Sequence, residues 1–289
     1  MPRAGARHDR LLIAQISDIH CGSQLFDGNL LTMAVGEIRA MEPDLVLVGG
    51  DLTQDGYAPE FDMARRYLEP LLSEEFTTLV IPGNHDAKNV GYLHFGDLFG
   101  PGDVPGKYDR VLNLSVNVDG RGPTQVLLMG MDSTKPDLAE GEIGRERYDW
   151  MRQYLAVEAD EKIFALHHHL VPVPGTGRER NTVWDAGDVL QLLSEVGVHV
   201  VLSGHKHVPY VWLVNGLLVV NSGTASSYRL RGYVRPSYNV IEITDTSIRV
   251  TFKYPGTGER FAGELDRETM TLHTSPDLAG MFAKAAWSA

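Results

Sequence analysis

The sequence of 289 residues has one cysteine, no apolar run as long as a membrane-spanning helix, and no block rich in lysine or arginine. With Cys21 alone, no disulfide can form within the chain. A spanning helix needs about 20 apolar residues, so we expect no membrane span. Residues 1–10 are polar and mixed in charge and lack the apolar core of a secretory signal. Together with the single cysteine, this predicts a cytoplasmic protein.

Positive charge is also scarce, because the formal net charge at pH 7 is −12. Proteins that bind long nucleic acids carry clustered lysines and arginines that contact the phosphates, so this class of partner is disfavoured. A small anionic substrate remains compatible with an acidic chain, since bound metal ions can be the largest local charges in a site.

The pattern of apolar residues predicts an α/β protein followed by antiparallel strands. Residues 10–90 read as strand, helix, strand, helix and strand, whereas the sequence beyond Val208 reads as strands only. Asn215-Gly216 between two apolar runs is a strong hairpin signal. Two sheets packed face to face, with helices outside, would accommodate both halves. Helices are expected over 29–41, 59–72, 148–157 and about 185–196.

Potential metal ligands follow five apolar runs that predict buried strands. Open α/β sheets bind ligands beyond the carboxyl ends of their strands, so we expect the five clusters to converge on one site. Carboxylates, imidazoles and an amide without a thiolate are the ligand set of a two-metal hydrolase. The clusters are Asp18-Ile19-His20, Gly50-Asp51, Gly83-Asn84-His85-Asp86, His167-His168-His169 and Gly204-His205-Lys206-His207.

Two of the clusters have potential ligands two residues apart. Side chains alternate along an extended segment, so Asp18 and His20 point to the same side and can hold one metal ion. His205 and His207 repeat this spacing, and both imidazoles can reach a pair of ions. The same alternation predicts that Lys206 points away from the site.

The remaining clusters suggest separate roles for their members. Asp51 could bridge two metal ions with its two carboxylate oxygens, and Asn84 can supply an uncharged carbonyl oxygen. His85, next to Asn84, can reach the reacting group without occupying a metal. Three successive histidines in a strand cannot all face one way, so only one or two of residues 167–169 point at the site.

The order of these motifs resembles that of the calcineurin-like metallophosphoesterase superfamily. The resemblance covers about residues 10–225 and includes Gly-Asp-Leu-Thr-Gln-Asp-Gly at 50–56 and Gly-Glu-Ile at 141–143. Within the superfamily, the chain looks most like the bacterial class III cyclic nucleotide phosphodiesterases and their glycerophosphodiesterase relatives. The resemblance implies a four-layer α-β-β-α sandwich of two mixed sheets, with a dinuclear metal site at the strand ends.

The same resemblance implies which residues hold the two ions. The first ion is expected on Asp18, His20, Asp51 and His207. The second ion is expected on Asp51, Asn84, His168 and His205. His167 is the alternative to His168, because Leu170 stands where the family has a proline two residues after the ligand. His85 matches the histidine that faces the substrate. Oxygen and nitrogen ligands admit Mn, Fe, Zn or Co, so the identity of the metals stays open.

The resemblance predicts a metal-dependent phosphodiesterase that hydrolyses small anionic phosphodiesters, with 3′,5′-cyclic nucleotides as the first candidates. Three alternatives stay open: a broad phosphomonoesterase, a hydrolase of phospholipid headgroups or glycerophosphodiesters, and a metal-binding regulatory protein without turnover. Oligomerisation is also open, because Arg229, Arg231 and Arg235 could meet a substrate phosphate, a partner subunit or only solvent. The expected organisation is a tail over 1–9, a metallophosphoesterase domain over 10–254 and an extension over 255–289.

Overall fold

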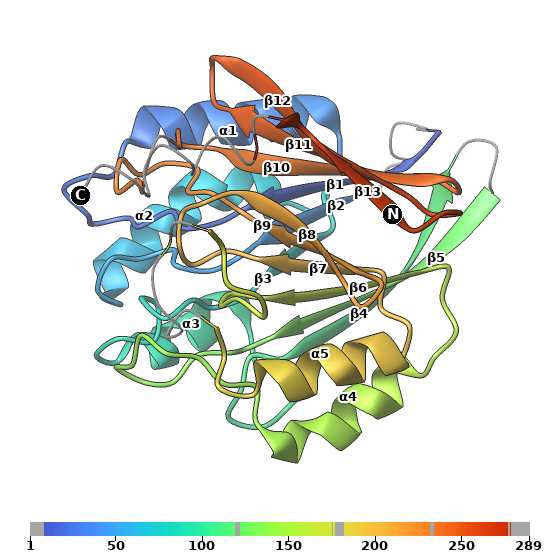
Figure 1. Cartoon of the computed structure of the whole chain (residues 1–289). Helices are drawn as coiled ribbons and strands as arrows, with labels where there is room; N and C mark the ends of the chain where they lie inside the picture. Colours follow the sequence, from blue (N-terminus) through green and yellow to red (C-terminus); the bar gives the residue numbers. More distant parts are fainter. Residues whose placement is uncertain are drawn as a thin grey trace, which may run out of the picture.

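The strands of the protein form two mixed sheets that pack face to face, with helices on the outer faces (Figure 1). The computed structural model describes residues 9–118, 122–174, 176, 182–231, 234–276 and 278. The predicted fold class, an α/β sandwich of two mixed sheets, is confirmed. Within the described ranges, none of the helices combines the length and the hydrophobicity that a membrane crossing requires.

The first sheet combines strands from both ends of the chain. Its order is β13-β12-β11-β10-β1-β2-β3, in which β1 pairs in parallel with β2 and antiparallel with β10. Its amino-terminal elements are β1 (Leu11–Ile16), α1 (Gly28–Met41), β2 (Leu45–Val48), α2 (Ala58–Leu68), η1 (Glu69–Leu71) and β3 (Thr78–Val80). Its carboxy-terminal strands are β10 (Tyr238–Ile243), β11 (Ser247–Tyr254), β12 (Gly258–Asp266) and β13 (Thr271–Thr274).

The second sheet is built from the middle of the chain, in the order β4-β5-β6-β7-β9-β8. Strands β5, β6, β7 and β9 run parallel, while β4 and β8 are antiparallel edge strands. The strands are β4 (Arg110–Val118), β5 (Gly122–Met131), β6 (Glu161–Leu166), β7 (Val200–Ser203), β8 (Tyr210–Val214) and β9 (Leu217–Asn221). The helices of this region are α3 (Gly91–Phe99), η2 (Arg145–Arg147), α4 (Tyr148–Leu155) and α5 (Ala186–Glu195).

Alternation along the buried strands divides the core into layers. In β1, Leu11 and Ile13 face the second sheet, whereas Leu12 and Ala14 pack in the cluster that α1 and α2 cover. Strand β6 alternates in the same way: one set of its side chains faces the first sheet, and the other set packs against helices α4 and α5. Both faces of these strands are therefore apolar, as expected for parallel strands covered on both sides.

The first sheet continues beyond Tyr254, where the sequence predicted that the domain ends. Strand β12 pairs antiparallel with β11, and β13 pairs with β12. Ala262 and Leu265 of β12 lie in the core between the two sheets. The predicted extension therefore begins with two strands of the main sheet, and the domain boundary stays a prediction. Most of the predicted tail over 1–9 and residues 279–289 lie outside the described residues.

Candidate metal centre

The predicted ligand clusters follow β1, β2, β3, β6 and β7, and side chains from these strand ends meet between the sheets. Among the described residues there are three groups of potential ligands, and within each group the ligand atoms lie within 4.8 Å of one another. Because one histidine belongs to the first two groups and one aspartate to the last two, the groups form one continuous site. They are Asp18, His20 and His207; His20, Asp51 and His85; and Asp51, His167 and His205.

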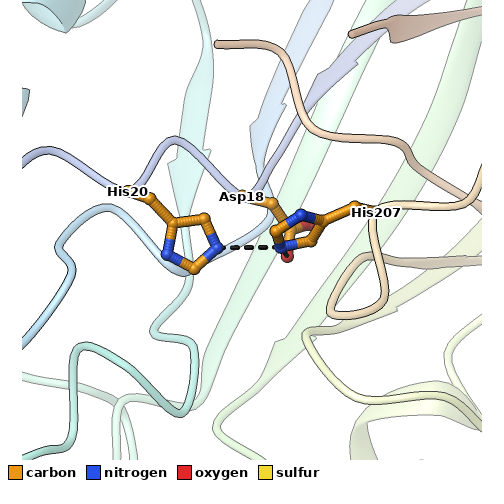
Figure 2. Close-up of side chains that lie close together, drawn as sticks. All are labelled: Asp18, His20 and His207. Atoms are coloured by element: carbon orange, nitrogen blue, oxygen red, sulfur yellow. Dashed lines mark hydrogen bonds and ion pairs between the residues drawn. The ribbon is translucent and has the colours of Figure 1, made fainter. Parts of the chain in front are cut away.

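Figure 2 shows the first group, in which two imidazoles and a carboxylate face one point. His20 Nε2 is 2.9 Å from His207 Nε2, which is 3.4 Å from Asp18 Oδ1. The other carboxylate oxygen of Asp18 accepts hydrogen bonds from the Ser17 hydroxyl at 2.6 Å and the His205 N–H at 3.0 Å. Asp18 Oδ1 is buried and lacks a hydrogen-bond partner among the described residues. These contacts hold the carboxylate with one oxygen directed at the two imidazoles.

Asp51 lies where the groups meet. Its Oδ1 accepts the backbone N–H of His85 at 2.7 Å. Its Oδ2 is 3.3 Å from His167 Nε2 and 3.7 Å from His20 Nε2. One carboxylate oxygen therefore faces a histidine of the first group and a histidine of the last group.

The predicted amide ligand, Asn84, lies beside the last group. His205 Nδ1 is 2.9 Å from Asn84 Oδ1. Within the described part of the chain, His205 Nε2 and His167 Nε2 are buried atoms without hydrogen-bond partners. Buried polar atoms are almost always satisfied, so each of these needs a partner that the described residues do not supply.

Left-handed backbone turns direct the ligands inward. Five non-glycine residues of the site have positive φ angles of 52–78°. Such conformations cost roughly 1–3 kcal/mol each and gather at functional sites. Asp18 and His20 therefore converge through these turns and not through the extended alternation that the sequence suggested. The five residues are Asp18, His20, Asp51, His205 and His207.

Glycines allow the turns after β2 and β3 to touch. Gly50 has φ +89°, and a Cβ there would lie 2.6 Å from the Gly83 nitrogen. A Cβ on Gly83 would lie 2.2 Å from the backbone nitrogen of Asp51. Side chains at these positions would force the two turns apart, and Asp51 with them.

Asp86 joins the same two turns, a role that the sequence analysis did not assign. Its buried carboxylate accepts the backbone N–H groups of Leu52, Thr53 and Gly83 at 2.9–3.2 Å. It also accepts the Thr53 hydroxyl at 2.9 Å. Burial and the nearby Asp51 raise the pKa of Asp86 to about 6. The signal for this role was its place directly after Asn84-His85, at the end of a tight turn.

The structure brings His167, and not His168, to Asp51. His167 Nδ1 donates to the Gly49 carbonyl at 2.7 Å, which leaves Nε2 facing the carboxylate. Both ring nitrogens of His168 are within hydrogen-bond distance of other groups, Nδ1 at 2.8 Å from Ser133 Oγ and Nε2 at 3.2 Å from the Ala139 carbonyl. The geometry therefore favours the alternative over the predicted ligand.

Burial controls the charges of the site. It raises the pKa of the Asp18 carboxyl to about 7. Burial also opposes ionisation of Asp51, but His167 and His85 hold its pKa well below the usual value. Burial lowers the pKa values of His20 and His205 well below normal, so these imidazoles are neutral, which is the form that binds metal. Burial lowers the pKa of His167, but the nearby Asp51 carboxylate outweighs this and raises that pKa to about 9, so a metal ion on His167 Nε2 would take the place of a proton. Unpartnered buried oxygens and the ring nitrogens of neutral His20 and His205 fit divalent cations.

His85, the predicted substrate-facing residue, lies at the edge of the metal centre. The His85 ring packs edge-on against His20, with the ring centroids 4.7 Å apart. His85 Nδ1 is 2.5 Å from the Gln54 carbonyl and 2.8 Å from Lys88 Nζ. These contacts set the orientation of a half-buried ring.

A cavity of about 290 Å³ opens onto the metal centre. Lys206 lines it, so the expectation that this side chain points away is wrong. The Arg229 carbonyl accepts a hydrogen bond from His207 Nδ1 at 2.5 Å, which fixes the ring so that Nε2 faces Asp18. The lining residues are Asp51, Asn84, His85, Ala139, His205, Lys206, His207, Arg229, Leu230 and Arg231.

A family model described as calcineurin-like phosphoesterase matches residues 11–209. The chain belongs to this family. It is therefore a metal-dependent phosphoester hydrolase, and the predicted resemblance is confirmed. Members of the family use a dinuclear metal site, and the Asp and His groups described above could bind metal in this chain.

Curated relatives and solved structures agree with this membership. A probable cyclic nucleotide phosphodiesterase of Synechococcus is 25% identical over 214 residues, covering 70% of this chain and 75% of its own. A probable glycerophosphodiester phosphodiesterase of Arcobacter nitrofigilis is 24% identical over 233 residues, covering 75% and 79%. A dimetal phosphatase from Danio rerio shares the fold with a TM-score of 0.65 at 12% identity, covering 87% of this chain and 98% of its own.

Proposed function

We propose that this protein is a dinuclear-metal phosphodiesterase of small phosphodiesters, with 3′,5′-cyclic nucleotides as the first candidate substrates. The observation that carries the proposal is the position of Asp51 Oδ2, which faces His20 on one side and His167 on the other. A carboxylate placed in this way suits two neighbouring ions. The names of the relatives, cyclic nucleotide phosphodiesterase and glycerophosphodiester phosphodiesterase, support a diester as substrate.

The proposed ligand sets follow the geometry. His167 takes the place that the sequence assigned to His168, because its Nε2 faces Asp51 without another partner among the described residues. The first ion would be held by Asp18, His20, Asp51 and His207. The second ion would be held by Asp51, Asn84, His167 and His205.

The chemistry is divided between the ions and the side chains. Two bound divalent ions would lower the pKa of a water nucleophile and stabilise the phosphoryl oxygens. Asp18 and Asp51 offset only part of their charge, so the cavity stays attractive to an anion. His85 Nδ1 donates to the Gln54 carbonyl, so only the imidazolium form of His85 would carry a second proton, on Nε2, that can pass to the leaving oxygen.

A substrate panel tests the proposed function. Protein stripped of metal and reconstituted with Mn²⁺ is expected to hydrolyse bis-p-nitrophenyl phosphate and cyclic AMP faster than p-nitrophenyl phosphate. A chelator should abolish all turnover, because the ions supply several kcal/mol of transition-state stabilisation. Faster hydrolysis of p-nitrophenyl phosphate would support the phosphomonoesterase, and glycerophosphocholine as the best substrate would support the headgroup diesterase. If the protein bound its full content of metal but turned over none of these substrates, the result would support the metal-binding regulatory protein without catalysis.

His85→Ala is expected to keep both metal ions. It should lower kcat for cyclic AMP by about 10²-fold, because the alkoxide that leaves from cyclic AMP needs a proton. The loss for bis-p-nitrophenyl phosphate should be smaller, since p-nitrophenolate leaves well without protonation. Turnover of both substrates and metal content by mass spectrometry check this prediction.

His94→Ala is the matched control, because His94 lies on α3 and its ring packs against Phe61, with the centroids 6.3 Å apart. This variant should change neither turnover nor metal content. If His85→Ala slowed both substrates equally, His85 would instead stabilise phosphoryl oxygens. If it lost a metal ion, His85 would be a ligand.

A further inference from the structure

One wall of the cavity beside the metal centre is positively charged. Lys206, Arg229 and Arg231 line it together with the proposed ligands. Across the residues that the structure describes, none of these three side chains has a carboxylate within 4.0 Å. By contrast, the surface residues Arg145 and Arg249 pair with acidic neighbours at 2.9 and 3.3 Å. Three cations without a carboxylate partner among the described residues stand out in a chain whose net charge is −12.

Sequence proximity and one backbone hydrogen bond keep this wall close to the metal centre. Lys206 lies between His205 and His207 in the sequence, and these two histidines belong to different ligand groups. The carbonyl of Arg229 binds His207 Nδ1 at 2.5 Å. Lys206 therefore starts from a segment that carries two proposed ligands, and the backbone of Arg229 is tied to one of them.

The charge of the wall exceeds what a simple diester can neutralise. Two divalent ions with the carboxylates of Asp18 and Asp51 leave roughly two positive charges, which suit the charge that develops on the scissile phosphate. The three further cations lie together on one wall of the cavity, which concentrates positive potential there. A 3′,5′-cyclic nucleotide or bis-p-nitrophenyl phosphate offers a single negative charge and leaves the wall without a counter-charge.

We propose that Lys206, Arg229 and Arg231 bind a second phosphate of the substrate, so that the preferred substrates are small phosphodiesters that also carry a phosphomonoester group. The inference rests on the proposed phosphodiesterase function, and within that function it ranks 3′,5′-cyclic nucleotides, which lack a phosphomonoester group, below diesters that carry one. Arginine suits this role, because its planar guanidinium group binds phosphate oxygens in pairs. Diesters without the second phosphate are turned over less efficiently.

Two probes that differ by one phosphate test the proposal. They are thymidine 5′-(p-nitrophenyl phosphate) and the same compound with a 3′-phosphate, assayed with the Mn²⁺-loaded full chain. The 3′-phosphate should raise kcat/KM by at least about 10-fold, the size of one charge-assisted hydrogen bond. In a binding measurement without turnover, thymidine 3′,5′-bisphosphate should bind at least about 10-fold more tightly than thymidine 5′-monophosphate.

Arg229→Gln/Arg231→Gln should bring both ratios close to unity. Arg235→Gln is the matched control, because the Arg235 guanidinium lies 6.0 Å from the centre of the Tyr254 ring and does not line the cavity. This control should keep both ratios. The same measurements on Lys206→Met should show an intermediate loss.

The outcomes separate this proposal from the proposed function. Turnover of both probes with equal kcat/KM would overturn the second-phosphate site and leave the phosphodiesterase intact. Turnover of neither probe would count against the phosphodiesterase, and the two binding constants would still decide whether a second phosphate is bound. Equal losses for both probes in the double variant would show that the arginines act on the scissile phosphate. Loss of the ratios in Arg235→Gln would show a general charge effect and overturn the assignment.

Discussion

Asp51→Asn is expected to lower kcat by about 10³-fold or more and to leave less than two metal ions per chain. Losing one ion removes a Lewis acid worth several kcal/mol, and each 1.36 kcal/mol corresponds to about a tenfold change in rate. Turnover of bis-p-nitrophenyl phosphate and metal content by mass spectrometry check the two parts of this prediction.

The hydrogen bonds of Asp51 explain why the amide cannot substitute. Oδ1 accepts the His85 N–H, so the asparagine must keep its carbonyl oxygen there. The amide NH₂ then replaces Oδ2, the atom that faces His20 and His167. An NH₂ group is a donor without an available lone pair, so it serves neither ion.

The control is Asp62→Asn, the same change at an exposed position of α2. It should keep both ions and full turnover. If Asp51→Asn retained two ions per chain with an unchanged circular dichroism spectrum, Asp51 would not be the bridging ligand and the dinuclear arrangement proposed above would be wrong.

His167→Ala is expected to lose one metal ion and to lower kcat by about 10³-fold, whereas His168→Ala keeps both ions. The difference follows from their ring nitrogens: His167 Nε2 faces Asp51, and His168 is bound to Ser133 and the Ala139 carbonyl. Metal content of the two purified variants is the deciding measurement.

His168→Ala should instead reduce the free energy of unfolding by about 2–3 kcal/mol, because it removes a buried ring and its contacts with Ser133 Oγ and the Ala139 carbonyl. Denaturant unfolding of the metal-free protein measures this loss. Metal loss in His168→Ala with full retention in His167→Ala would restore the ligand that the sequence predicted.

The architecture and the chemistry of the site were predictable from local pattern. Parallel strands that are buried on both faces need continuous apolar runs, and such runs precede all five ligand clusters. Because the carboxyl ends of parallel strands share one edge of a sheet, polar residues after several runs indicate a common site. Strands β12 and β13 escaped prediction, since the first half of β12 is largely exposed and the β11–β12 register shifts at Val250/Thr251.

The sequence by itself determined the types of candidate ligand, their order and the strands that carry them, whereas tertiary structure decided which side chains face one another in the candidate site. His167 continues the face of β6 that carries Ile163 and Ala165 toward the first sheet, and His168 continues the face of Phe164 and Leu166 toward the helices. Both faces are apolar, so alternation alone cannot distinguish the inner one. Lys206 lines the cavity for a related reason: the left-handed backbone at its two neighbours breaks the extended alternation, and only the packed sandwich supports those turns.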